Sequence, residues 1–298
     1  MNGTRGARPD ELGAHVSAAG GVARAPARAE ALGCACLQLF TKQPSRWAEP
    51  VLPRREIRAF RRERQTCGIR VAGAHDSYLI NLSSPDPVLW ERSVESFRQE
   101  LERCTALALD FLVTHPGNAT DGNLEEGAER NARGLASALE RVEGSTRVLL
   151  EITSGSGTSV GGSFDHIARI LEALAPPHRE RVGVCFDTCH VYAAGYDLVG
   201  DYAGVWDAFD RVLGLELLGL IHMNDSKHPL GSRKDRHEAI GEGTLGAEPF
   251  RRIMRDARLA HVPKILETPK GSNGTEADLQ NLARLRALRA SESRPPTG

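Results

Sequence analysis

The chain has 298 residues, a formal net charge of −1 and 26% charged residues. A charge this close to zero excludes a protein that binds nucleic acid over a uniformly basic surface. No apolar stretch approaches the roughly 18 residues of a membrane helix and no secretory leader is recognisable, so we expect a cytoplasmic protein without membrane contact.

Eight short apolar runs rich in Val, Ile and Leu divide the chain, as expected for parallel strands that are buried on both faces. Helical periodicity fills the intervals, for example over 90–109 and 164–175. Each run with its following helix is a βα unit. The predicted strands are LGAH (12–15), CLQLF (36–40), RVAGAH (70–75), FLVTH (111–115), VLLE (148–151), VGVCFD (182–187), GLIH (219–222) and KILE (264–267).

Eight βα units in one chain of this length predict a single-domain (β/α)8 TIM barrel, an α/β fold with its active site at the carboxyl ends of the strands. We place the barrel at 11–288, because no linker interrupts the strand rhythm. Residues 1–10 and 289–298 are polar and rich in helix breakers, so we expect flexible tails there.

Most predicted strands end on a histidine or a carboxylate, and two short loops add further ones. Imidazole and carboxylate together suit Zn²⁺, Mn²⁺ or Fe²⁺, and a catalytic zinc uses three protein ligands, so nine donors suffice for about three ions. The candidate metal ligands are His75, His115, Glu151, Asp187, His190, His222, Asp235, His237 and Glu267.

Two spacings within this set indicate how the donors divide. Asp187 ends a strand and His190 follows it in the loop, so the two side chains can serve different ions. Asp235 and His237 lie two residues apart in a predicted extended segment and therefore point to one side, where they can hold one ion together. His15 ends the first strand without a partner at ligand spacing, and it is either a ligand or a structural residue.

Six cysteines have spacings that fit neither paired zinc motifs nor a disulfide framework for so long a chain. We expect reduced structural thiols and no metal ligands among them. They are Cys34, Cys36, Cys67, Cys104, Cys185 and Cys189.

Basic residues concentrate in the loops after the second and seventh strands, on the same face as the candidate ligands. A basic, aromatic-bearing rim around a metal centre favours a phosphate-rich substrate. The basic run over 53–64 differs, because it is helical and mixed with Glu, and we expect it to face solvent on the barrel exterior. The candidate DNA contacts are Lys42, Arg46, Trp47, Tyr78, Lys227, Arg233 and Arg236.

The segment GEGTLG (241–246) matches a dinucleotide-binding glycine pattern. No strand leads into its first glycine, and no acidic residue follows at the required distance, so we expect no nucleotide cofactor.

Several long motifs resemble the endonuclease IV family of apurinic/apyrimidinic endonucleases, which are zinc-dependent deoxyribonucleases of base excision repair with a barrel fold. The motifs occur in the family's order from residue 13 to residue 268. They are GAHVSAAGG, AHDSYLINL, HPG, GVCFDTCHVYAAGYDL, HMNDSK, GSRKDRHEAIGEG and ILET.

The resemblance implies three zinc ions per chain, with Mn²⁺ or Fe²⁺ possible at some positions. It assigns His75, His115 and Glu151 to the first ion. Glu151 then bridges to a second ion that is held by Asp187, His222 and Glu267. His190, Asp235 and His237 hold the third.

The resemblance also implies the reaction. A metal-bridging hydroxide, with Glu151 and Glu267 as catalytic residues, would hydrolyse the phosphodiester 5′ to an abasic site in duplex DNA and leave a 3′-hydroxyl and a 5′-deoxyribose phosphate. A monomer acting at the nucleoid is implied. The chain departs from the family pattern at Ser45, where an arginine is common, and at Ile152 and Ser156, which replace Asn and Gln.

The alternative is a divalent-metal sugar isomerase or epimerase with a similar barrel. Such an enzyme would use Glu151, Asp187, His222 and Glu267, and it would leave the other five candidate ligands without a function.

Overall fold

A closed barrel of parallel strands forms the centre of the protein, which a computed structural model describes over residues 11–271 and 274–290. The predicted (β/α)8 fold is confirmed. The strand order around the barrel is β1-β10-β7-β6-β5-β4-β3-β2. The barrel strands are β1 (Leu12–His15), β2 (Cys36–Phe40), β3 (Val71–His75), β4 (Phe111–Thr114), β5 (Arg147–Glu151), β6 (Val182–Asp187), β7 (Leu218–His222) and β10 (Lys264–Leu266).

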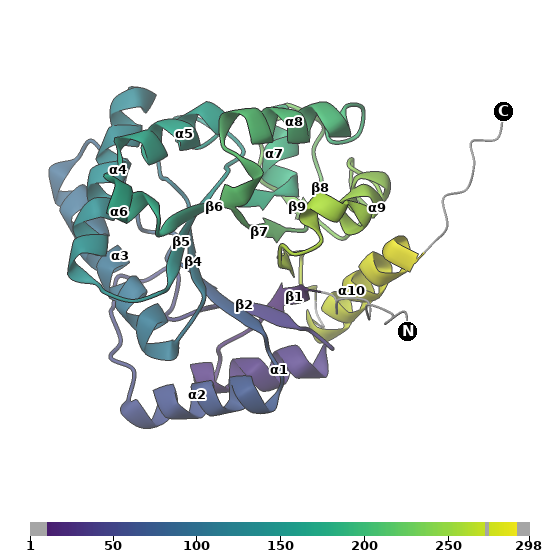
Figure 1. The fold of residues 1–298 in the computed structure, drawn as a ribbon, viewed down its shortest axis with the longest axis horizontal. Coiled ribbons are helices and arrows are strands. Elements are labelled where there is room, and N and C mark those ends of the chain that lie inside the picture. Colours follow the sequence, from purple (N-terminus) through teal and green to yellow (C-terminus); the bar gives the residue numbers. More distant parts are fainter. Residues whose placement is uncertain (1–10, 272–273, 291–298) are drawn as a thin grey trace, which may run out of the picture.

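Helices surround this barrel, as Figure 1 shows. Three short 3₁₀ turns complete the outer layer: η1 (Val22–Arg24), η2 (Leu215–Leu217) and η3 (Ala257–Leu259). The helices are α1 (Ala25–Ala31), α2 (Arg54–Thr66), α3 (Pro87–Leu107), α4 (Leu124–Arg141), α5 (Phe164–Ala173), α6 (Pro176–Arg179), α7 (Thr188–Ala194), α8 (Tyr202–Val212), α9 (Glu248–Arg255) and α10 (Gly274–Ala290).

Local signals explain where the helices begin. Helix α3 starts three residues before the predicted position because the Asp86 side chain accepts hydrogen bonds from the amides of Val88 and Leu89, and Pro87 is pre-set for the first turn. Ser163 caps α5 in the same way. Helix α10 continues to Ala290, two residues into the tail predicted at 289–298. The predicted tail at 1–10 and the rest of the second tail, 291–298, lie outside the described residues.

The inside of the barrel is filled by a small apolar cluster that includes Cys36, Phe111, Leu149 and Ile265. Gly73 is required there, because a Cβ at this position would lie 2.0 Å from the ring of Phe111. The barrel is therefore a packed core and not a pore, and the candidate ligands on the strands lie above this cluster, at the carboxyl ends of the strands.

The loop after β7 folds back on itself as a two-stranded antiparallel ribbon of β8 (Asp225–Ser226) and β9 (His237–Glu238). Backbone hydrogen bonds from Gly231 and Arg233 to the carbonyls of Tyr192 and Ala193 hold this loop against the end of α7. No described helix is long and apolar enough to cross a membrane.

Candidate metal centre

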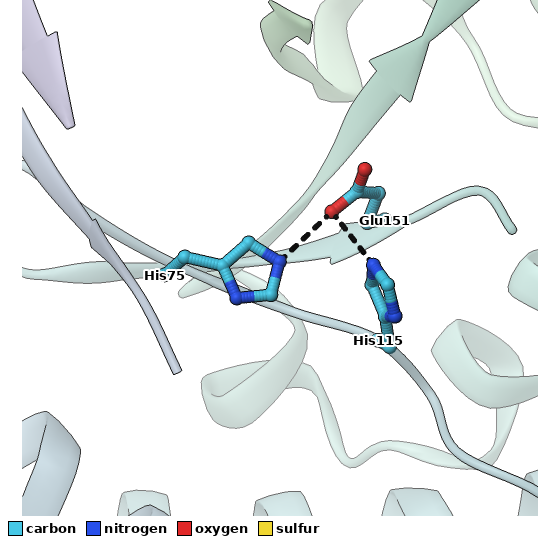
Figure 2. Close-up of side chains that lie close together, drawn as sticks. All are labelled: His75, His115 and Glu151. Carbon is cyan, nitrogen blue, oxygen red and sulfur yellow. Dashed lines mark hydrogen bonds and ion pairs between the residues drawn. The ribbon is translucent and has the colours of Figure 1, made fainter. Parts of the chain in front are cut away.

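The first donor group consists of His75, His115 and Glu151, at the ends of three neighbouring strands. Nε2 of His75 lies 3.1 Å and Nε2 of His115 lies 3.2 Å from the same oxygen, Oε2 of Glu151. Figure 2 shows both rings turned toward this oxygen. The parallel register of β3, β4 and β5 thus brings together residues that are far apart in sequence.

The ring of His75 is held from its other side. Nδ1 lies 3.0 Å from the backbone oxygen of Asp76, which can only accept, so Nδ1 carries the proton and Nε2 presents a lone pair to the group. The Asp76 carboxylate lies 3.5 Å from Nδ1 and accepts a hydrogen bond of 2.6 Å from Thr114 Oγ1. A histidine fixed in this way is typical of a metal ligand.

The second donor group consists of Glu151, Asp187, His222 and Glu267. Nδ1 of His222 lies 3.0 Å from Glu151 Oε1, 3.2 Å from Glu267 Oε2 and 3.9 Å from Asp187 Oδ2. Glu151 therefore belongs to both groups and offers a different oxygen to each. Within the second group, Glu151, Asp187 and His222 are completely buried.

A buried amide, Gln38, orients two members of the second group. Its Oε1 lies 3.0 Å from Nε2 of His222, and its Nε2 donates to Oε1 of Glu267 at 2.6 Å. Because Oε1 of Gln38 only accepts, Nε2 of His222 holds the proton and Nδ1 presents its lone pair to the carboxylates. We gave Gln38 no function from the sequence, although a glutamine that points into a strongly apolar barrel is itself a signal.

The sequence also assigned no function to a second buried amide, Asn224. Its Nδ2 donates to Asp187 Oδ2 at 2.6 Å, and its Oδ1 accepts from the backbone amide of Glu267 at 2.9 Å. It lies two residues beyond the strand-end His222 and therefore on the same side of the chain as that ligand.

The third donor group consists of His190, Asp235 and His237. Nε2 of His190 lies 3.2 Å from Asp235 Oδ2, and Nε2 of His237 lies 3.3 Å from Asp235 Oδ1. His190 lies in the first turn of α7 and not in a loop as predicted, because the Asp187 carboxylate accepts from the His190 amide at 2.8 Å and caps the helix.

The ribbon that carries Asp235 and His237 is built around the buried carboxylate of Asp225. This carboxylate accepts hydrogen bonds from the amides of Gly241, Gly243 and Leu245 at 2.9 to 3.0 Å. The GEGTLG segment therefore wraps a carboxylate of its own chain, and a Cβ on Gly243 would collide with the backbone oxygen of Ser226 at 2.4 Å.

The three groups concentrate negative charge in a buried volume. Burial opposes protonation of His75, but the hydrogen bond and charge of Glu151 outweigh it and raise the pKa of His75 to about 10. Burial alone would raise the pKa of Glu151, yet the charges of His222 and His115 hold it well below its usual range. The carboxylates therefore require positive charge at this place, either as protons on imidazoles or as cations.

The donor spacing fits cations. Two ligands at the usual zinc distance of about 2.1 Å in a tetrahedral site lie about 3.4 Å apart. The donor atoms within each group lie within 4.8 Å of one another, and the closest pair in each group is 3.0 to 3.2 Å apart. Nitrogen and oxygen donors in this combination suit zinc, manganese or iron.

His15, which the sequence left open, belongs to none of these groups. Its Nδ1 lies 2.9 Å from Glu267 Oε1, the same oxygen that Gln38 holds. The thiols of Cys185 and Cys189 also approach the second group and its neighbour His237, but burial raises the pKa of both thiols, and the donor groups are complete without them.

The prediction that Lys42 contacts DNA is wrong. The Lys42 side chain is 1% exposed, its ammonium group lies 2.5 Å from Glu49 Oε1, and it donates to Ser96 Oγ at 3.1 Å. Arg103 and Glu100 extend this buried network on α3. A buried ammonium with these partners is not available to a ligand.

The other predicted contacts lie at the surface near the donor groups. Arg46 is exposed, and Trp47 is half-buried with the guanidinium of Arg92 at 4.3 Å from its ring, which covers one face. Tyr78 is 66% exposed, and its ring packs edge-on against Phe40 at 5.4 Å.

The basic residues of the ribbon loop are exposed as predicted: Lys227, Arg233 and Arg236. Lys227 lies 3.8 Å from Glu238, and Arg236 donates to the backbone oxygen of Asp235 at 2.6 Å. Arg233 has a φ of 54°, in the left-handed region that non-glycine residues rarely adopt.

Comparisons with known proteins agree on one family. A family model described as xylose isomerase-like TIM barrel matches residues 26–288. The probable endonuclease 4 of Chloroflexus aggregans is 46% identical over 280 residues, which cover 93% of this chain and 97% of the relative. The probable endonuclease 4 of Geobacter sulfurreducens is 45% identical over 286 residues, 94% of each chain.

A solved structure of the same family is also similar to this chain. Endonuclease IV from Thermus thermophilus matches with a TM-score of 0.83 and 39% identity, over 94% of this chain and 98% of that one. A D-tagatose 3-epimerase-like protein matches with a TM-score of 0.63 at 16% identity, over 86% of this chain and 88% of that one, and shares the fold alone. The chain therefore belongs to the endonuclease IV family of DNA-repair nucleases, as its motifs predict.

Proposed function

We propose that this protein is a deoxyribonuclease IV that hydrolyses the phosphodiester 5′ to an abasic site in duplex DNA and leaves a 3′-hydroxyl and a 5′-deoxyribose phosphate. The observation that carries the proposal is the sharing of Glu151 between two donor groups, with a third group beside them. A centre for several cations is suited to phosphodiester hydrolysis, in which charge develops on several oxygens at once.

Each donor group would hold one ion, three zinc ions per chain, with manganese or iron as alternatives at some positions. Zinc bound there would lower the pKa of a water to give a hydroxide nucleophile at neutral pH and would neutralise charge on the phosphate oxygens. The ligands would be His75, His115, Glu151, Asp187, His190, His222, Asp235, His237 and Glu267.

The residues of the chain would orient the reaction. Glu151 would fix the distance between two cations, because its two oxygens face different groups. Glu267 has one oxygen held by Gln38 and His15, so only Oε2 is free to face the His222 side of the site and position the attacking water. These two carboxylates are the proposed catalytic residues.

DNA would lie across the rim formed by the loops. Tyr78 is the exposed aromatic residue beside the first donor group, and an abasic nucleotide leaves the stack easily because it has no base to unpair. The proposed phosphate and groove contacts are Arg46, Trp47, Tyr78, Lys227, Arg233 and Arg236. We propose that the enzyme acts as a monomer, in the cytoplasm at the nucleoid.

A sugar isomerase or epimerase would need the second donor group alone. The two imidazoles of the first group, and the third group held by the Asp225 ribbon, would then have no function. These two groups are the observation that favours the endonuclease.

The test uses a duplex with one tetrahydrofuran abasic analogue. We expect incision on the 5′ side of the analogue and close to three zinc ions per chain by metal analysis. Glu151→Gln should lower the incision rate at least about 100-fold and keep DNA binding measurable. Glu129→Gln, on the exposed surface of α4, is the matched control and should change neither. No incision by the wild-type protein, with ketose–aldose exchange of a sugar instead, would refute the proposal.

A further inference from the structure

Helix α2 is strongly basic, and half of its arginines have no hydrogen bond or ion pair among the described residues. Its sequence RREIRAFRRERQT contains six arginines and two glutamates. Arg64 binds Asp110 at 2.5 Å and the backbone oxygen of Ala108 at 2.6 Å, and Arg61 binds the backbone oxygen of Ala106 at 2.5 Å. These two arginines join the end of α2 to the amino-terminal end of β4, opposite the metal centre.

The first turns of α2 carry Arg54, Arg55 and Arg58, which we call the α2 arginine face. All three are exposed, and within the described residues they have no hydrogen bond or ion pair. Nothing in the protein itself therefore accounts for them.

Two of these arginines also stand where a cation is unfavourable. Arg54 and Arg55 occupy the first two positions of α2, next to the positive end of the helix dipole, where acidic residues are preferred. The preceding Pro53 provides no side-chain cap, and the Glu56 carboxylate accepts the amide of Val22 at 2.8 Å. The sequence gives up helix stability at this place, which indicates selection for another property.

The start of α2 lies at the rim of the metal centre. Glu56 and Leu52 line a cavity of about 560 Å³ together with His15 and Phe40, whose side chains border the first and second donor groups. In Figure 1, α2 lies on the outside of the barrel beside α1. A rod-shaped polyanion bound across the rim would therefore pass this edge of the molecule.

We propose that the α2 arginine face binds the phosphate backbone of the duplex that flanks the lesion. The inference rests on the proposed function, since the DNA must first lie across the metal centre. Duplex DNA carries a negative charge about every 1.7 Å along its axis, so it offers several phosphates to three arginines within two helical turns. Guanidinium groups bind phosphates in a planar, bidentate way.

The experiment measures DNA binding against salt concentration in a Glu151→Gln background, which keeps the substrate intact. The variant Arg54→Gln/Arg55→Gln/Arg58→Gln should lower the slope of log K against log salt by about 0.9 for each lost phosphate contact, between about 1 and 3 in all. The effect should appear on an abasic duplex of about three helical turns and shrink on one of about one turn, which ends near the lesion.

The matched control removes the same charge elsewhere. Arg133→Gln/Arg141→Gln/Arg169→Gln changes exposed arginines on α4 and α5, and it should leave the slope unchanged. An equal fall in slope for both triple variants would assign the effect to net charge and overturn the inference. So would an unchanged slope in the α2 variant.

A second variant separates binding from folding. Arg54→Glu/Arg55→Glu should raise the melting temperature, because acidic residues suit the helix start, and should weaken binding to the long duplex. A higher melting temperature with unchanged binding would overturn the inference. If the wild-type protein neither cuts nor binds abasic duplex, the proposed function fails as well, whereas incision with an unchanged slope refutes the α2 contact alone.

Discussion

The amide nitrogen of Gln38 lies 2.6 Å from Oε1 of Glu267, and the oxygen of the same amide lies 3.0 Å from Nε2 of His222. One buried side chain thus orients both a carboxylate and an imidazole, whose facing atoms, Oε2 of Glu267 and Nδ1 of His222, lie 3.2 Å apart. Loss of a residue that hydrogen-bonds metal ligands in this way typically lowers metal affinity or activity by about 10- to 100-fold.

Gln38→Leu should therefore weaken binding of the second zinc by about 10- to 100-fold and slow incision by a similar factor. Leucine has nearly the same size, so the fold should persist. Metal content after dialysis against a graded chelator measures the affinity directly. Leu37→Met, the neighbouring position on β2 that faces the helices, should retain full metal content; equal metal retention by both variants would refute the role of Gln38.

Removal of metal should lower the melting temperature markedly, because the three donor groups place several buried carboxylates next to one another. An ion at 1,000 times its dissociation constant stabilises the folded state by about 4 kcal/mol. Scanning calorimetry of the protein after exhaustive chelation tests this. Zinc should restore the melting temperature, and Mg²⁺ should not, since imidazole donors do not suit it.

Asp225→Ala should release the ribbon that carries Asp235 and His237. Three backbone amides would lose a charged acceptor, at a cost of about 2 to 4 kcal/mol. We expect metal analysis to find about one ion fewer per chain. Asp201→Ala, which removes the cap of α8, should cost about 1 kcal/mol and leave the metal content unchanged. Full metal content in the Asp225 variant would show that the ribbon is held by other contacts.

Lys264 gives a test of pH dependence that does not involve the donor groups. Its ammonium group is buried and donates to the backbone oxygens of Leu259 and Val262 at 2.7 and 2.9 Å. Burial lowers the pKa of Lys264 from 10.5 to about 8. The unfolded chain therefore binds more protons than the folded protein between pH 8 and 10.5, and the stability contribution of this residue rises with pH across that window.

Relative to Lys264→Met, the wild-type protein should gain up to about 3 kcal/mol in free energy of unfolding as the pH rises from 8 to 10.5. Urea unfolding of both proteins at several pH values measures the difference. A difference that stays constant across this range would mean that the pKa of Lys264 is not lowered in the folded state.

The sequence predicted the barrel well because each strand is a local apolar run. Seven of the nine candidate ligands lie at a strand end, directly after one, or in the first turn of the helix that follows. His115 and Glu267 lie one residue beyond β4 and β10, a shift without consequence for their position. In a parallel barrel the carboxyl ends of all strands lie on one face. Residues at strand ends are therefore expected to meet there, even when they are far apart in the sequence.

Residues whose function depends on tertiary partners were not predicted. Lys42 looks like a surface cation in sequence, and only the packing of its loop against α3 places Glu49 and Ser96 around it. Gln38 and Asn224 are single amides in apolar or short polar surroundings, and their partners lie about 40 to 230 residues away. Local patterns contain no information about such distant partners.

The barrel closes where β1 pairs with β10, and the last candidate ligand, Glu267, directly follows β10. During synthesis on the ribosome, the amino-terminal strand must wait for its final neighbour until more than nine-tenths of the described chain has left the exit tunnel. The proposed second zinc site cannot be completed before that moment. A nascent or truncated chain would therefore be unable to cut DNA, and the nuclease would become active only together with the closure of its own fold.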